Sequence, residues 1–306
     1  MRDQIRRLGA ALLLAAAANA AAVPAHAQSW PRGPLVLDLG GAGTLVGGAE
    51  VSAVAGQRDD DAFFNYTGYE HNALRLLRIA LAARWQPIER AAVLADVRSE
   101  NFETPRLYAL YARVTPFAGV PLDVQAGRIP PVFGRFARQS YAADNPLIGY
   151  PLAYQYLTSL RSDAVPSASE DLLRMRGRGW LASYPIGDRN AAPGVALVSP
   201  FRYDNGVQAR YAPGKFEIAA AYTMGSLSEP GANHEGRQIP ARAAIEPMTG
   251  LILAVSGARG GWLDESVIPA GDGKDYAQQA IGADVEYSRD HWIVRGESIR
   301  SQWSLP

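Results

Sequence analysis

The sequence predicts an all-β protein with the architecture of an antiparallel up-and-down transmembrane β-barrel. Three observations predict it. Apolar and polar residues alternate along successive segments, short and long connections alternate between those segments, and an export signal stands at the N-terminus. Alternation with period two is the strand period. Barrels of the outer membrane join such strands by short turns on one side and by longer loops on the other.

The first 27 residues have the features of a secretory signal peptide. Basic residues precede an apolar stretch from Leu8 to Val23, and Ala25-His26-Ala27 provides a small-x-small cleavage site. The apolar stretch is short for a membrane anchor. We therefore expect cleavage before Gln28, a signal peptide at 1–27 and a transmembrane β-barrel at 28–306.

Composition excludes several classes of function. The chain has no cysteine, which excludes disulfide scaffolds and thiolate metal sites. Thirty basic residues balance thirty acidic ones, which argues against a nucleic-acid partner. The mature histidines, His71, His234 and His291, accompany no G-x-S-x-G nucleophile motif. We therefore predict no enzyme activity, no cofactor and no metal site.

Eleven segments carry the strand pattern. In chain order they are Ala49–Gly56, Leu74–Trp85, Ala91–Ser99, Arg106–Val114, Leu122–Arg128, Tyr203–Ala212, Phe216–Met224, Arg237–Ile245, Leu251–Ala258, Ala277–Ser288 and His291–Arg300. Gly43–Gly48 is an extension of the first segment in one interpretation. Pro240 weakens the eighth segment, because proline cannot donate a hydrogen bond to a ladder.

Within these segments one face is almost free of charge. The apolar faces comprise Leu77, Ile79, Leu81 and Ala83; Val93, Ala95 and Val97; Tyr108, Leu110, Ala112 and Val114; Leu122, Val124 and Ala126; Phe216, Ile218, Ala220 and Tyr222; and Ile281, Ala283, Val285 and Tyr287. A soluble sheet hides its apolar face in a core, whereas a membrane barrel shows it to lipid and keeps the polar face in a water-filled lumen. The many alanines favour lipid, since a core between two sheets requires bulkier side chains. A soluble exported β-protein is the alternative.

The connections support the barrel. The short ones are Gln86–Arg90, Thr115–Pro121, Pro213–Lys215, Glu246–Gly250 and Arg289–Asp290. Those between them are longer and more polar, with Glu100–Pro105 as the weakest case. Aromatic residues beside the short turns predict a girdle at the membrane boundary. These residues are Trp85, Tyr211, Phe216, Tyr287 and Trp292.

The strand count predicts a C-terminally incomplete barrel. Eleven strands would end on the loop side, whereas bacterial barrels have an even number of strands. Pro306 also differs from the aromatic residue that usually ends such chains. The alternative is a further strand near Val36–Gly40, which would restore an even count.

Two stretches of the central region carry a family resemblance. They are LYALYARVTPFAGVPLDVQAGRIPPVFG (Leu107–Gly134) and DNPLIGYPLAYQYLTSLR (Asp144–Arg161). In a strand hairpin followed by Gly-Arg-x-Pro-Pro-x-Phe-Gly, the chain resembles bacterial outer-membrane porins of the phosphate-selective and related general type. The resemblance implies a barrel in outer-membrane lipid, passive diffusion of small solutes or ions, and a homotrimer. The lysine-rich lining associated with phosphate selectivity is not visible, because the chain has only Lys215 and Lys274.

Alternation assigns charged residues to the lumen wall. The pore-lining candidates are Arg78, Arg84, Asp96, Arg98, Arg113, Asp123, Arg210, Glu217, Arg242, Asp284, Glu286 and Arg295. Rings of fixed charge set selectivity in pores, and here the signs nearly cancel. We therefore expect cross-strand ion pairs and weak selectivity.

The long connection Ile129–Arg202 is the other candidate functional segment. Constriction candidates in and beside it are Arg128, Arg135, Arg138, Asp144 and Arg161, with the arginines expected to face Asp144 or Asp163. One interpretation folds part of this loop into the lumen, and the other lets it cover the outer mouth. If the lumen is filled, a plugged structural or adhesin-type barrel is the alternative to a porin.

Overall fold

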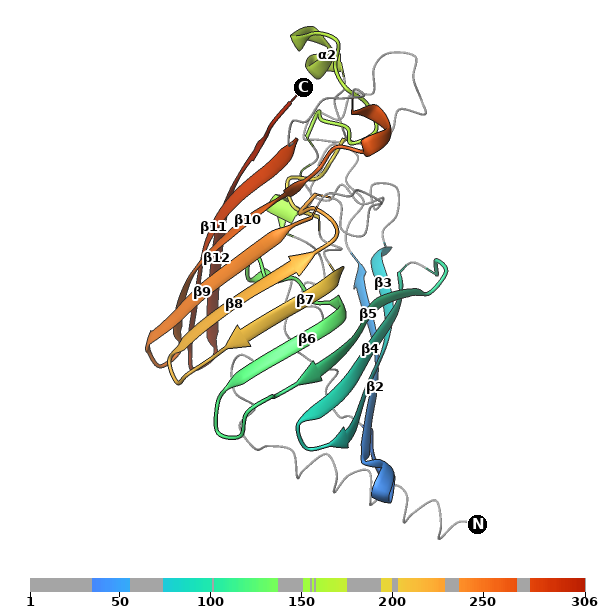
Figure 1. Ribbon diagram of the computed structural model, residues 1–306, viewed down its shortest axis with the longest axis vertical. Helices are drawn as coiled ribbons and strands as arrows, with labels where there is room; N and C mark the ends of the chain where they lie inside the picture. Colours follow the sequence, from blue (N-terminus) through green and yellow to red (C-terminus); the bar gives the residue numbers. More distant parts are fainter. Residues whose placement is uncertain are drawn as a thin grey trace.

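The computed structural model describes residues 35–55, 74–100, 102–136, 151–154, 156, 158–174, 194–199, 203–228, 237–268 and 276–305. Twelve strands form one antiparallel sheet in which each strand pairs with its neighbours in the chain, from β1 to β12 (Figure 1). The prediction of an all-β antiparallel meander is therefore confirmed. Within the described residues, no helix has the length and apolar character needed to cross a membrane.

The strands agree closely with the predicted segments. Their bounds are β1 Leu35–Asp38, β2 Thr44–Ala55, β3 Leu74–Ile88, β4 Ala91–Glu100, β5 Arg106–Val114, β6 Leu122–Ile129, β7 Asp204–Tyr211, β8 Phe216–Thr223, β9 Ile239–Met248, β10 Leu251–Gly261, β11 Ala277–Arg289 and β12 Trp292–Trp303. The strand considered near Val36–Gly40 exists as β1, and the proposed extension through Gly43–Gly48 belongs to β2.

Short turns gather at one end of the sheet, the lower end in Figure 1. They join β1 to β2, β3 to β4, β5 to β6, β7 to β8, β9 to β10 and β11 to β12. The β9–β10 turn requires glycine, because Gly250 has φ +83° and a Cβ there would meet the Ser288 carbonyl oxygen at 2.2 Å. The predicted alternation of short and long connections is confirmed except between β4 and β5, where the connection 101–105 is shorter than the turn 115–121 between β5 and β6.

Pro240 lies inside β9, where it interrupts one ladder only. The β9–β10 ladder continues through the pair Ala258 and Pro240. The regular β8–β9 pairing stops at Ala220 and Ala241 and resumes as an isolated bridge between Thr223 and Gln238. A proline, which has no N–H, is tolerated at such a break in the ladder. Pro240 therefore does not prevent β9 from forming.

Polarity across the sheet is the reverse of that in an ordinary soluble sheet. In β8 exposed and buried residues alternate strictly, and the exposed ones are Phe216, Ile218, Ala220 and Tyr222. On β11 Ile281 is 70% exposed, while Asp284 and Glu286 on the other side of the strand are buried. We call these two surfaces the apolar face, defined by the exposed apolar residues, and the polar face, defined by the buried charged residues. The faces follow the predicted alternation.

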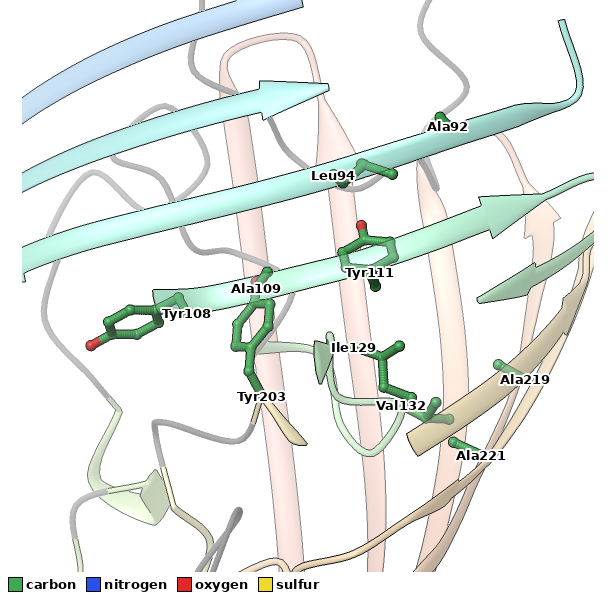
Figure 2. Packing of buried hydrophobic residues seen from close by; sticks show 10 residues of the cluster. All are labelled: Ala92, Leu94, Tyr108, Ala109, Tyr111, Ile129, Val132, Tyr203, Ala219 and Ala221. Carbon is green, nitrogen blue, oxygen red and sulfur yellow. The ribbon is translucent and has the colours of Figure 1, made fainter. Parts of the chain in front are cut away.

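Tyr108 is the exception, and the prediction that it belongs to the apolar face is wrong. The β4–β5 register shifts between Asp96, which pairs with Ala109, and Val97, which pairs with Leu107. Tyr108 is therefore the extra residue of a β-bulge, and one extra residue reverses the facing of the strand beyond it. Tyr108 and Ala109 are both buried, and Figure 2 shows them in a cluster with Tyr111 and Tyr203.

Candidate functional site

A row of alternating charges crosses the polar face from β6 to β11. Arg210 Nη1 lies 3.8 Å from Asp123 Oδ2, and Arg210 Nη2 donates to Glu217 Oε2 at 2.7 Å. Arg242 Nη1 lies 3.8 Å from Glu217 Oε1, and Arg242 Nη2 donates to Asp284 Oδ1 at 2.7 Å. We call these five residues the charge row.

Strand register builds the charge row. Ala219 in β8 pairs with Arg210 in β7 on one side and with Arg242 in β9 on the other. Because alanine is small, the two long arginine side chains can extend past it to Glu217, two residues away on the same face. The Glu217 and Arg242 side chains are each only 2% exposed. Charges buried to this degree require partners, and the register supplies them.

A second cluster fixes the segment that follows β6 onto β10, β11 and β12. Glu286 in β11 accepts from Arg135 at 3.0 Å and from Arg295 in β12 at 2.7 Å. Glu297 Oε1 accepts from the Arg135 backbone N–H at 3.1 Å and from the Tyr154 hydroxyl at 2.6 Å. Arg135 therefore pairs with a strand carboxylate, whereas the sequence interpretation expected Asp144 or Asp163 as its partner. Of the arginines named in that interpretation, Arg161 does meet Asp163.

Apolar contacts and amides reinforce this attachment. Phe133 is fully buried with Tyr154 and Val198 against the alanines of β10 and β11. A Cβ on Gly282 would lie 3.1 Å from the Phe133 ring, so the glycine leaves room for that ring. Gln278, also fully buried, donates to the Leu197 carbonyl at 3.0 Å. The parts of the long connection near Phe133, Tyr154 and Val198 thus pack on the polar face of the sheet, whereas α2 (Ser169–Arg174) lies beyond the upper ends of the strands (Figure 1).

A third cluster lies on the polar face at β4 and β5. Arg98 Nε donates to Asp96 at 3.1 Å, and the Arg98 guanidinium lies 4.6 Å from the centre of the Tyr108 ring. Tyr108 meets Tyr203 edge to face, with ring centres 6.2 Å apart. A cation over an aromatic face is attracted by the quadrupole of the ring. The bulge that displaces Tyr108 therefore also completes this arginine site.

The predicted pore-lining residues all lie on the polar face. These are Arg78, Arg84, Asp96, Arg98, Arg113, Asp123, Arg210, Glu217, Arg242, Asp284, Glu286 and Arg295. The predicted set contains only charged residues and leaves out the uncharged polar residues of the same face. Gln208, which donates to Gln125 at 2.6 Å, and Ser256, which accepts from the Gly134 N–H at 3.1 Å, are the main omissions. The same period-two alternation would have found them.

The structure describes three of the constriction candidates, Arg128, Arg135 and Arg161, and each has a different partner. Arg128 belongs to β6, pairs in register with Leu110, and donates from Nε to the Tyr108 carbonyl at 3.0 Å. Arg161 donates twice to Asp163, each time at 2.8 Å. These hydrogen bonds hold the pKa of the Asp163 carboxyl below its usual value. Arg138 and Asp144 lie outside the described residues.

Replacing Tyr154 with phenylalanine tests the attachment of the long connection. The substitution removes the hydroxyl that donates to Glu297 and keeps the ring that packs with Phe136. We expect the free energy of unfolding to fall by about 1.5 kcal/mol, the lower range for a hydrogen bond to a charged group. Urea unfolding in detergent measures it. Tyr156→Phe is the control, because Tyr156 is exposed, and an equal loss in both variants would contradict the assignment.

These features define a class: a single-sheet antiparallel β-protein with an exposed apolar face and a buried charged face that carries a packed connection. Among the residues that the structure describes, no group of three or more histidine or acidic side chains is placed to hold a metal ion. No protein-family model matches the chain, and no curated protein is significantly similar to it in sequence.

Proposed function

We propose that this chain is a bacterial outer-membrane β-barrel that forms a water-filled channel for the passive diffusion of small solutes or ions. The observation that carries the proposal is the reversed polarity of the sheet. Val255, Ile281 and Val51 are among the most exposed large hydrophobic residues, whereas the charged residues Glu217, Arg242 and Asp284 are buried. Such a sheet is unstable with its apolar face in water, and lipid is the solvent that suits it.

The ends of the strands support this placement. Trp85, Tyr211, Phe216 and Trp292 are exposed on the apolar face beside short turns, with Trp292 at 76%. Aromatic rings prefer the membrane–water boundary. At the other end of the strands, Arg259, Gln279, Arg300 and Gln302 are exposed. An apolar band between an aromatic girdle and a polar margin is what a spanning sheet requires.

In this proposal the sheet closes into a barrel around the polar face, with the short turns in the periplasm and the longer loops outside. Closure removes the two sheet edges, which would otherwise be open to pairing with other chains. Three such barrels, each formed by one chain, associate as a homotrimer, as in the family that the central region resembles. The signal peptide predicted at 1–27 supplies the route of export.

The charge row favours weak ionic selectivity. Each arginine of the row lies between two carboxylates, so the field of one charge is cancelled within one or two strands. A ring of one sign would raise the local concentration of the opposite ion. The row's three carboxylates and two arginines leave a net charge of only one negative unit, and we expect anions and cations to pass at similar rates along this part of the wall.

The packed connection supports a narrowed lumen and, as a second candidate, a plugged structural barrel. Phe133 and Tyr154 occupy space on the polar face that would otherwise be open to solvent. If the remaining space holds water, the segment is a constriction. If it does not, the barrel is an adhesin-type or tethering protein.

Conductance distinguishes these functions. The full chain, refolded in detergent and added to a planar lipid bilayer under a salt gradient, is expected to give stepwise currents with a small reversal potential. Deleting Asp144–Arg161, which contains Tyr154, is expected to raise the single-channel conductance. Protein that is shown to be inserted but carries no current would favour the plugged barrel. Protein that stays monodisperse without detergent would contradict both membrane functions.

A further inference from the structure

Two arginines on the polar face differ from the others. Arg84 in β3 and Arg113 in β5 form no ion pair or hydrogen bond from their side chains within the part of the chain that the structure describes. Arg98, Arg210 and Arg242 each lie against a carboxylate. Arg84 and Arg113 are therefore two positive charges of the polar face that no neighbouring carboxylate cancels.

Register brings the two guanidinium groups toward one another. Arg84 pairs with Leu94 in β4, and Arg113 pairs with Ala92 in the same strand. The two arginines thus flank β4 on one face, offset by two residues, near the short-turn end. Strands two apart are separated by about 10 Å, a span that long side chains reach across from both sides. Two like charges on one face at this spacing repel one another.

The surroundings do not relieve this repulsion. The adjoining carboxylates are engaged elsewhere, since Asp96 binds Arg98 and Asp123 accepts from Thr115 at 3.1 Å and faces Arg210. Between the two arginines the floor is apolar and buried, formed by Leu94 and Ala92. The Nε atom of Arg84 is buried without a hydrogen-bond partner. An unsatisfied buried donor costs free energy unless an acceptor reaches it.

We propose that Arg84 and Arg113 form a binding position for a small oxyanion of the class of inorganic sulfate or phosphate. A guanidinium presents a planar fork of donors that matches oxyanions in a bidentate manner. A doubly charged anion between the two forks would neutralise both charges and give Arg84 Nε an acceptor. Because the position lies on the polar face, opposite the apolar face, its ligand is a dissolved ion and not a lipid headgroup.

This inference goes beyond the proposed channel, because binding does not require conduction. In the proposed orientation the position lies at the periplasmic end of the lumen, whereas the charge row lies further around the wall. It therefore predicts one anion site on an otherwise balanced surface.

Isothermal titration calorimetry tests the proposal on the full chain, refolded in a detergent without phosphate headgroups at low ionic strength. We expect saturable binding of sulfate, one ion per chain, and competition by phosphate. The double variant R84Q/R113Q is expected to weaken binding by about tenfold or more, because two charged hydrogen-bonding groups are lost. R106Q is the matched control, since Arg106 is exposed and its ion pair is with the exposed Glu103; the affinity of this variant should equal that of the unmodified chain.

Two results would overturn the proposal: no saturable heat from a chain whose strand content is shown by circular dichroism, or equal affinity in R84Q/R113Q. Removing two like charges relieves repulsion, so the double variant is expected to fold. Its midpoint of thermal unfolding should no longer rise with sulfate, whereas that of the unmodified chain should rise. Sulfate binding without conductance would contradict the channel alone, and conductance without sulfate binding would contradict the anion site alone.

Discussion

Replacing Arg242 with methionine is expected to lower the free energy of unfolding by about 3–5 kcal/mol, the cost of breaking a buried ion pair by removing one partner. Arg242 lies between Glu217 and Asp284, and all three side chains are 2% exposed. The variant leaves two carboxylates buried with one attractive partner fewer. Methionine fills most of the volume, so the loss reports charge more than packing.

Urea unfolding in detergent micelles, followed by tryptophan fluorescence, measures this loss. Arg106→Met is the matched control. Its ion pair with Glu103 has side chains 70% and 61% exposed, and exposed pairs contribute about 0–1 kcal/mol. The triple variant R242M/E217Q/D284N should recover much of the loss, because it removes the uncompensated charges as well. A loss below about 1 kcal/mol in R242M would mean that water reaches the charge row.

Much of this arrangement follows from local sequence. Period-two alternation was enough to separate Glu217 from Phe216 and Ile218, and to assign every predicted lumen charge to the polar face. Facing is a property of one strand, and it depends only on the backbone geometry of that strand. The same holds for the turns, because Gly250 and its neighbours indicate a reversal without knowledge of any distant residue.

The register between neighbouring strands could not be predicted from the sequence. Whether Arg242 meets Glu217, Asp284 or another acid depends on how β8, β9 and β11 slide past one another. The bulge at Tyr108 is of the same kind, since a single extra residue in β5 relative to β4 reversed its facing. β1 was assigned only as an alternative, because four residues carry too short an alternation to stand out.

Contacts between the long connection Ile129–Arg202 and the sheet were even harder to predict from the sequence. Arg135 and Glu286 are separated by 151 positions in the chain, and composition predicted only that arginines in this region would find some acid. Gln278 and Ser256 carry no charge, yet Gln278 holds Leu197 and Ser256 holds Gly134 in place. Period-two reasoning identifies such residues as facing inward, but only the folded chain shows what they bind.

Replacing Val255 with arginine is expected to make folding into a bilayer less favourable by about 2–4 kcal/mol, which is the cost of arginine near the midplane on the lipid side of a barrel. Val255 is 59% exposed in the middle of β10, and its register partners are Ala243 and Ala283. None of these neighbours can pair with the new charge. On a surface in contact with water, the same substitution would change stability by less than about 0.5 kcal/mol.

The control for this experiment is an arginine placed near the boundary of the membrane and not near its midplane. Gln302 is exposed on the apolar side of β12 near the loop end, where it pairs with Gln279. Arginine near the membrane boundary costs only about 0–1 kcal/mol, so Gln302→Arg should refold into lipid vesicles as the unmodified chain does. The measurement is the urea dependence of refolding into vesicles for the three proteins. If Val255→Arg and Gln302→Arg refold equally well, the apolar face does not meet lipid and the membrane function fails. If only Val255→Arg is impaired, water is not the solvent of that face, because water would not distinguish the two positions.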